Sequence, residues 1–384
     1  MALHPKPNEW RSPKPNEWKS ISPMASGRCW GGVCVNDHQF LVIGQCSGRP
    51  AGYALCEFYD TRTRKWKDLP IYLPLRQVVG NRVSVMGGSW DFYFSTNFGV
   101  ASLSNRIYVM GGCDSSSSGR SQSDLISIDI PDGDLSNITS TDWKKLAPMK
   151  YPRKFFACVS HSKHIYVFGG TNYVGMLNGD PDRREAPERY DTETNEWTTL
   201  PTMPGGKRTA CAAAVIGNKI YVVGGWNDSE TLASVIVFDT LKQQWESLDD
   251  ERSRSGAGDS VATSTYDPYK IVPDMETRRY KMVVVAVDNF LFVIGGMDED
   301  DNELFSIEVL DTETNSWKCA TTRIDHGRYN PVIGFLKETN EIILAGGTNT
   351  GDPKPQTNAI LTNGLLEITR KRILFYRFGA NIEE

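Results

Sequence analysis

Four arginines recur at one distance before a glycine, and their spacing is the clearest chemical signal in the sequence. Arg28, Arg153, Arg208 and Arg279 precede Gly44, Gly169, Gly224 and Gly295 by the same number of residues. Ser95 takes this place before Gly111, and Arg328 takes it before Gly346 if the intervening turn is two residues longer. A guanidinium binds carboxylates and phosphates through paired hydrogen bonds, so converging arginines would attract an acidic or phosphorylated segment.

The same register has a second interpretation. A repeated arginine also braces neighbouring parts of a repeat protein by donating hydrogen bonds to backbone carbonyls, without any ligand. The sequence leaves both interpretations open.

Other side chains offer little for catalysis or metal binding. Five histidines are present, and none has a nucleophile in a recognisable setting. The scattered cysteines lack the paired spacing of a zinc site, which indicates free thiols in a reducing compartment. They are Cys29, Cys34, Cys113, Cys158, Cys211 and Cys319. We therefore expect no catalytic residue, no metal and no cofactor.

An internal repeat organises the chain. Apolar segments that end in two glycines are Ile107–Gly112, Ile165–Gly170, Ile220–Gly225, Leu291–Gly296 and Ile343–Gly347, and Phe40–Gln45 lacks the second glycine. Most are followed by Asp-Thr and then a tryptophan, at Trp66, Trp197, Trp245 and Trp317, with a looser copy that ends at Trp143. The glycines suit crowded strand ends, and Asp-Thr suits a tight hairpin. Each repeat predicts one antiparallel sheet of four short strands.

The double glycine, the tyrosine in the Ile-Tyr-Val strands and the spaced tryptophan resemble the kelch motif. The resemblance covers nearly the whole chain from about Trp18 onward. It implies an all-β fold, a kelch β-propeller whose sheets, or blades, surround a central channel. Six glycine-ended strands predict six blades. Equivalent positions of a propeller lie on a circle, so the arginines would meet at one mouth of the channel.

The last repeat has no tryptophan after Gly347, and the N-terminal segment supplies a match. Trp18 to Met24 aligns with Trp143 to Met149, which predicts that residues of about 16–24 complete the sixth blade. The alternative is that Ile373 to Phe378 forms the last strand. We expect residues 1–15 to be a flexible extension and residues 16–384 to be the propeller.

Three segments depart from the repeat. Residues 71–98 include Trp90, Phe92 and Tyr93, which are either partner contacts or packing over the edge of their own blade. Residues 249–277 are polar and predict a mobile loop. Asp298 to Glu303 is an acidic turn that suits a solvated hairpin tip better than calcium.

Composition narrows the class of function. The net charge of −5 argues against nucleic-acid binding, and no apolar run suits a signal peptide or a membrane span. We expect a monomeric, cytoplasmic or nuclear, non-enzymatic platform, either a scaffold or an adaptor of a ubiquitin ligase. Its partner would be a protein, in the form of an acidic peptide segment or a larger assembly. The alternative is a kelch enzyme such as a sialic-acid epimerase or an iron-dependent specifier protein, although the Glu, Asp and His triad of the latter is not found.

Overall fold

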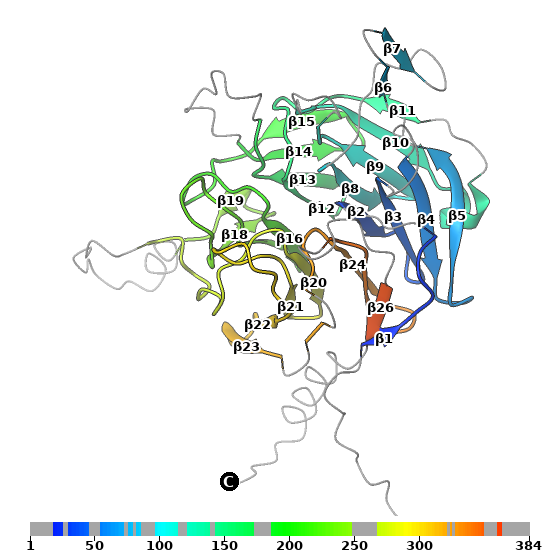
Figure 1. Ribbon diagram of the computed structural model, residues 1–384. Coiled ribbons are helices and arrows are strands. Elements are labelled where there is room, and N and C mark those ends of the chain that lie inside the picture. Colours follow the sequence, from blue (N-terminus) through cyan, green and yellow to red (C-terminus); the bar gives the residue numbers. More distant parts are fainter. Residues whose placement is uncertain are drawn as a thin grey trace, which may run out of the picture.

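The structure is a computed structural model, and Figure 1 shows its course. It describes residues 18–25, 30–45, 54–72, 76–79, 82–85, 97–113, 121–138, 143–172, 186–247, 267–320, 323–324, 327–348 and 359–362. Among these residues, no helix is long and apolar enough to cross a membrane.

Antiparallel strands make up nearly all the regular structure of the described residues, in six sheets of four strands. The first sheet contains β2 (Trp30–Cys34), β3 (Gln39–Gln45), β4 (Ala54–Asp60) and β5 (Lys65–Tyr72). The second contains β8 (Gly99–Leu103), β9 (Arg106–Met110), β10 (Leu125–Asp129) and β11 (Lys144–Leu146). The third contains β12 (Ala157–His161), β13 (His164–Phe168), β14 (Glu188–Asp191) and β15 (Glu196–Thr199).

The remaining sheets repeat this order. The fourth contains β16 (Ala212–Ile216), β17 (Lys219–Val223), β18 (Val235–Asp239) and β19 (Gln244–Trp245). The fifth contains β20 (Val283–Val287), β21 (Phe290–Ile294), β22 (Ile307–Asp311) and β23 (Ser316–Cys319). The sixth contains β24 (Val332–Leu336), β25 (Glu341–Ala345), β26 (Ala359–Thr362) and β1 (Lys19–Ser20).

Small elements complete the described structure. β6 (Arg76–Val79) and β7 (Arg82–Val85) form a separate hairpin within the insertion of residues 71–98. Two 3-10 helices, η1 (Pro131–Gly133) and η2 (Leu135–Asn137), lie between β10 and β11. Because these helices have only three residues each, the fold is all-β, as the sequence predicts.

The innermost strands contact one another in a cyclic order. β2 contacts β8, β8 contacts β12, and the series continues through β16, β20 and β24 back to β2. These strands lie near the centre of Figure 1, while labels such as β5, β15 and β23 lie toward its edge. Sheets arranged radially about one axis define a β-propeller, so the predicted all-β propeller architecture is confirmed.

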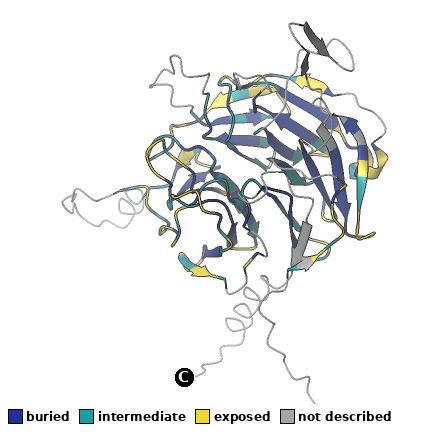
Figure 2. Ribbon diagram, in the orientation of Figure 1, coloured by how far each residue is buried: buried dark blue, intermediate teal, exposed yellow. Residues whose placement is uncertain are grey.

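The hydrophobic core is divided among the gaps between neighbouring sheets. Leu41 and Phe58 of the first sheet pack with Val109 of the second, for example, and Phe168 of the third packs with Phe238 of the fourth. Because a sheet inside this arrangement has neighbours on both faces, its central strands are buried almost throughout, as the dark ribbons of Figure 2 show. Outer strands such as β15 are largely exposed.

The N-terminal strand pairs with the end of the chain that the structure describes. β1 is antiparallel to β26, with Lys19 opposite Leu361 and Ser20 opposite Ile360. Met24, which follows β1, is 2% exposed and belongs to the core between the sixth and first sheets. The competing strand at residues 373–378 and the proposed extension at residues 1–15 lie outside the described residues.

Candidate functional site

The repeated arginines are buried inside the sheets. Arg153 and Arg279 are 0% exposed, and Arg208 and Arg328 are 3% and 1% exposed. The Nη1 atom of each donates a hydrogen bond of 2.9 to 3.2 Å to the carbonyl of the first glycine in its pair, at Gly169, Gly224, Gly295 and Gly346. This is the bracing geometry. These four arginines therefore do not form the predicted cationic rim, because their side chains are buried and do not reach the surface of the mouth.

Two of these arginines form ion pairs with buried glutamates. Arg153 Nη2 lies 2.7 Å from Glu188 Oε2 on β14, and Arg279 Nη2 binds Glu308 Oε1 on β22. Glu188 also accepts a hydrogen bond of 2.8 Å from the backbone N–H of Lys150, in the connection that leads into the sheet. A buried charge is tolerated when such partners satisfy it, so each pair ties that connection to its own blade.

Arg208 differs from its two counterparts. Ile236 of the fourth sheet occupies the position that Glu188 occupies in the third. Each lies opposite the valine of an Ile-Tyr-Val segment on the neighbouring strand. The Arg208 guanidinium instead donates to Ser234, at 3.0 Å to its carbonyl and 2.8 Å to its hydroxyl. Desolvation lowers the pKa of Arg208, as expected for a cation held by neutral acceptors.

A run of left-handed residues joins the blades at the mouth of the channel. Asn97, Phe155, Ala210, Lys281 and Asn330 all have φ between 51° and 58°. Ala210 N donates to Phe155 O at 2.8 Å, Lys281 N to Ala210 O at 2.9 Å, and Asn330 N to Lys281 O at 3.0 Å. Each residue lies two positions after the arginine register or Ser95. In the blades that the structure describes, the residues two positions after the register are therefore linked to one another, and they line the mouth of the channel.

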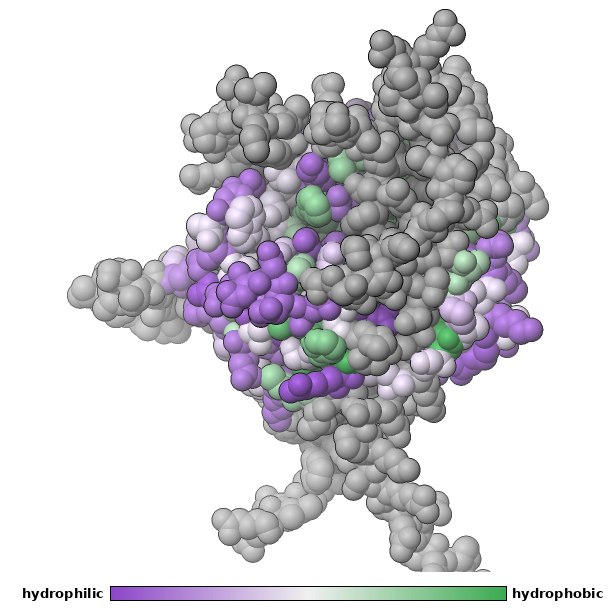
Figure 3. Space-filling view, viewed as in Figure 1, coloured by the Kyte–Doolittle hydropathy of each residue, from purple (hydrophilic) through white to green (hydrophobic). Residues whose placement is uncertain are grey.

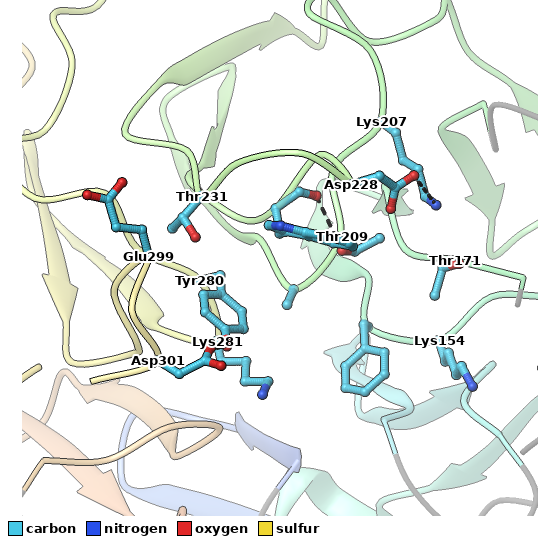
Figure 4. Close-up of a pocket in the computed structure, with 13 residues that line it drawn as sticks. Lys154, Thr171, Lys207, Thr209, Asp228, Thr231, Tyr280, Lys281, Glu299 and Asp301 are labelled. Carbon is cyan, nitrogen blue, oxygen red and sulfur yellow. Dashed lines mark hydrogen bonds and ion pairs between the residues drawn. The ribbon is translucent and has the colours of Figure 1, made fainter. Parts of the chain in front are cut away.

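A cavity of about 660 Å³ opens at this mouth, beside the ends of β12, β16 and β20 (Figure 4). Its walls come from the third, fourth and fifth sheets and include Phe155, Trp226, Tyr280 and Lys281. Trp226 is 39% exposed, which is unusual for so large an apolar side chain. Figure 3 shows hydrophobic areas set among hydrophilic residues on the face in view. The cavity thus joins apolar and polar surface, as binding sites do.

Charges of both signs line this cavity. The cations are Lys154, Lys207 and Lys281, and the carboxylates are Asp228, Glu299 and Asp301. Lys207 Nζ lies 2.7 Å from Asp228 Oδ2, and the Tyr280 hydroxyl donates a hydrogen bond to Asp301. Desolvation together with the neighbouring carboxylate of Asp301 raises the pKa of Tyr280, so the phenol stays protonated. The described lining of the cavity is therefore rich in charge, with equal numbers of positive and negative side chains.

Lys281 lies beside two aromatic rings at the cavity. Its Nζ atom lies 4.9 Å from the ring centre of Tyr280 and 5.1 Å from that of Tyr329. The Lys281 ammonium also donates a hydrogen bond to the sulfur of Met297, at 3.8 Å. Desolvation lowers the pKa of Lys281, although Asp301 opposes the shift. Aromatic faces hold an ammonium without using its hydrogen-bond donors, which leaves donors for an anion.

A second cavity, of about 460 Å³, follows the central channel. Its walls are the inner strands, with Cys34 and Cys158 among mainly valine and alanine side chains. Cys34 Sγ donates to Phe335 O at 3.3 Å and Cys158 Sγ to Val100 O at 3.4 Å, each across a gap between sheets. Burial raises the pKa of both thiols to about 12, so they pack as neutral side chains and are not nucleophiles.

Only some of the predicted site residues lie in the part of the chain that the structure describes. It describes four of them, and Arg28, Ser95, Trp90, Phe92 and Tyr93 lie outside the described residues. Sequence reasoning missed Lys154, Lys207, Lys281 and Trp226. The sequence did contain a signal for these residues. The three lysines lie within two residues of the arginine register, and Trp226 directly follows the glycine pair of the fourth sheet. Within the described residues, no three His, Cys, Asp or Glu side chains gather as a metal site.

Comparisons with known proteins agree with the repeat pattern. A family model for the KLHDC2/KLHL20/DRC7 Kelch-repeats domain matches residues 94–272, and the Kelch motif model matches residues 278–322. Kelch-like protein 15 of Danio rerio is 28% identical over 179 residues, which are 43% of this chain and 29% of the relative. The F-box/kelch-repeat protein OR23 of Arabidopsis thaliana is 24% identical over 318 residues, 77% of this chain and 64% of the relative.

Spermatocyte protein spe-26 of Caenorhabditis elegans is 36% identical over 191 residues, which cover 48% of this chain and 28% of the relative. Each match thus spans less than two thirds of the relative's own length. Together with the fold and the glycine, Asp-Thr and tryptophan pattern, these matches identify the class of protein. The chain belongs to the kelch-repeat family and folds as a kelch β-propeller.

Proposed function

We propose that this chain is a non-enzymatic platform that binds an acidic or polar segment of a partner protein at the channel mouth. The observation that carries the proposal is the cavity of about 660 Å³ beside β12, β16 and β20, with the Lys281 ammonium inside it. An exposed tryptophan and a partly desolvated cation in one concave site are typical of protein recognition. In this proposal, lysines and not the predicted arginines bind the acidic segment.

The proposal includes a propeller of six blades closed by the N-terminal strand. It is supported by the six four-stranded sheets, the cyclic contacts of the inner strands and the pairing of β1 with β26. Closure of this kind joins the two ends of the chain through hydrogen bonds, so the ring opens only when that strand is lost. A closed ring gives the mouth a fixed shape.

A scaffold and a ligase adaptor both fit this platform. The relatives include Kelch-like proteins and an F-box/kelch-repeat protein, and their names are compatible with either role. Free thiols at Cys34, Cys56, Cys158 and Cys211 fit the cytoplasmic or nuclear location proposed here. We propose a monomer, because the mouth is complete within one chain.

Quantitative affinity purification tests the platform. The full chain is compared with the double variant Lys281→Asn and Trp226→Ala, and with the control Lys163→Asn and Leu241→Ala. Lys163 and Leu241 lie in hairpin turns between strands rather than in the cavity, and Leu241 is 74% exposed. We expect the cavity variant to lose a specific set of captured proteins that the control retains. Identical capture by both variants would remove the mouth as the binding site.

A further inference from the structure

Lys281 is set up to accept one carboxylate. Its ammonium sits between the rings of Tyr280 and Tyr329, and its backbone is fixed by the hydrogen bond from Lys281 N to Ala210 O. The side chain extends into the open part of the cavity in Figure 4. A carboxylate placed there would receive charge-assisted hydrogen bonds in a partly desolvated setting, where such bonds are strong.

Trp226 supplies an apolar wall of the same cavity. Its backbone is paired with Thr209 and Thr231 through isolated bridges, so its position is fixed although 39% of the residue is exposed. Phe155 and Ala210 line the cavity with it. Exposed aromatic surface in a concave site gains most from burial under a large apolar side chain.

The carboxylates of the cavity restrict the charge of the ligand. Asp228 is already paired with Lys207, and Asp301 accepts from the Tyr280 hydroxyl. Among the described residues that line the cavity, three lysines and three carboxylates leave no net positive charge to balance a dianion. A phosphate group of charge about −1.5 to −2 at Lys281 would be repelled by Asp301, whereas one carboxylate carries only a single negative charge.

Building on the proposed function, we propose that the cavity recognises a short unphosphorylated segment in which an Asp or Glu lies close to a large apolar side chain. The carboxylate binds Lys281 between Tyr280 and Tyr329. The apolar side chain packs against Trp226 and Phe155. Lys281 and the two aromatic side chains line the same cavity, so we expect a ligand to make both contacts at once.

Selection from a displayed library of random heptapeptides on the full chain tests this proposal. Enriched peptides are synthesised with a fluorescent label, and their dissociation constants are measured by fluorescence polarisation. We expect enriched sequences to combine an acidic residue with Phe, Trp, Leu, Ile or Met. Replacing either residue of a peptide by alanine should weaken binding on the order of tenfold.

Variants of the protein locate the two contacts. Lys281→Asn keeps the left-handed backbone, since Asn330 adopts φ of 51° at the equivalent position. We expect this variant, and Trp226→Ala, each to weaken binding on the order of tenfold. Lys163→Asn and Leu241→Ala should leave affinity unchanged. A Lys281→Asn variant that weakens acidic peptides but not their alanine versions assigns the carboxylate to Lys281.

The outcomes separate this inference from the broader proposal. Peptides that need the cavity but lack an acidic or an apolar residue would overturn the inference and keep the platform. Tighter binding after Asp is replaced by phosphoserine would do the same, because it would make the site a phosphate receptor. Failure to enrich any peptide, or binding unaffected by both cavity variants, would overturn the inference and the proposed binding site together.

Discussion

At the scale of single residues, the buried arginines show how a repeat protein places charge inside a core. Each guanidinium reaches the carbonyl of a glycine that ends a strand, and Arg153 and Arg279 also meet a glutamate. The Arg208 guanidinium instead donates hydrogen bonds to neutral acceptors of Ser234 and Gly224. The three blades therefore provide a natural comparison between a buried ion pair and a buried single cation.

We expect Arg153→Met to lower the free energy of unfolding by roughly 3–5 kcal/mol, because it leaves the buried Glu188 carboxylate without its cation. Arg208→Met should cost roughly 1–3 kcal/mol, since it leaves only neutral groups unpaired. Urea unfolding followed by circular dichroism measures both. Adding Glu188→Ile to Arg153→Met should recover part of the loss, as Ile236 occupies the equivalent position. An equal loss in the double variant would argue against the ion pair as the cause.

Glycine at a strand end gives a second test at this scale. A methyl group on Gly169 would lie 2.2 Å from the carbonyl oxygen of Arg208, whereas one on Gly217 would meet nothing within 4 Å. Both glycines have positive φ. We expect Gly217→Ala to cost roughly 1–2 kcal/mol, from backbone strain alone. Gly169→Ala should cost more than about 3 kcal/mol in the same urea experiment. Equal costs would mean that the close approach to the next blade is unimportant.

At the scale of elements, the Asp-Thr turns organise the outer hairpins. Asp191 Oδ1 accepts hydrogen bonds from the backbone N–H groups of Glu193 at 2.9 Å and Thr194 at 3.2 Å. Asp239 and Asp311 make the same two bonds in their own blades. The side chain thus replaces water as the acceptor for the turn, and this explains why the motif recurs before the tryptophan strands of these blades.

These turns predict a dependence of stability on pH. Desolvation raises the pKa of Asp191, but hydrogen bonds from Glu193 and Thr194, with Lys163 nearby, outweigh it and lower the pKa from 3.8 to about 2. A carboxyl whose pKa falls on folding stabilises the protein above its unfolded value, and this contribution is lost as pH falls toward 2. We expect the free energy of unfolding to decrease from pH 5 to pH 2. Asp191→Asn should show a smaller decrease, and an unchanged slope would contradict the assignment.

At the scale of the whole molecule, stability depends on how the ring closes. Deletion of residues 1–24 removes β1 and the buried Met24, so we expect a lower melting temperature, by roughly 2–5 °C if about 2–4 kcal/mol is lost. Deletion of residues 1–15 is the control and should leave the melting temperature unchanged. Deletion of residues 363–384 tests the alternative closing strand. A larger loss from that deletion than from residues 1–24 would favour closure by the C-terminal segment.

Much of the fold was predictable because its units are local. Glycine pairs, Asp-Thr turns and tryptophans act within one blade, so their order along the chain predicted four-stranded sheets and a kelch propeller. The number of blades and the closing strand stay predictions that the six sheets and the pairing of β1 support. The candidate site was less predictable, because Lys281 and Trp226 come from different sheets and meet only when the sheets pack.

The amino-acid sequence alone determined that arginines recur in one register, and the resemblance to the kelch motif predicted that this register surrounds a common axis. Only the tertiary structure decided that Arg153, Arg208 and Arg279 point into the sheets while Lys281 lines the mouth. The physical reason is that burial depends on acceptors brought by other strands, such as Gly169 O and Glu188, which no local pattern reveals. The surface that remains for a partner is therefore set by packing.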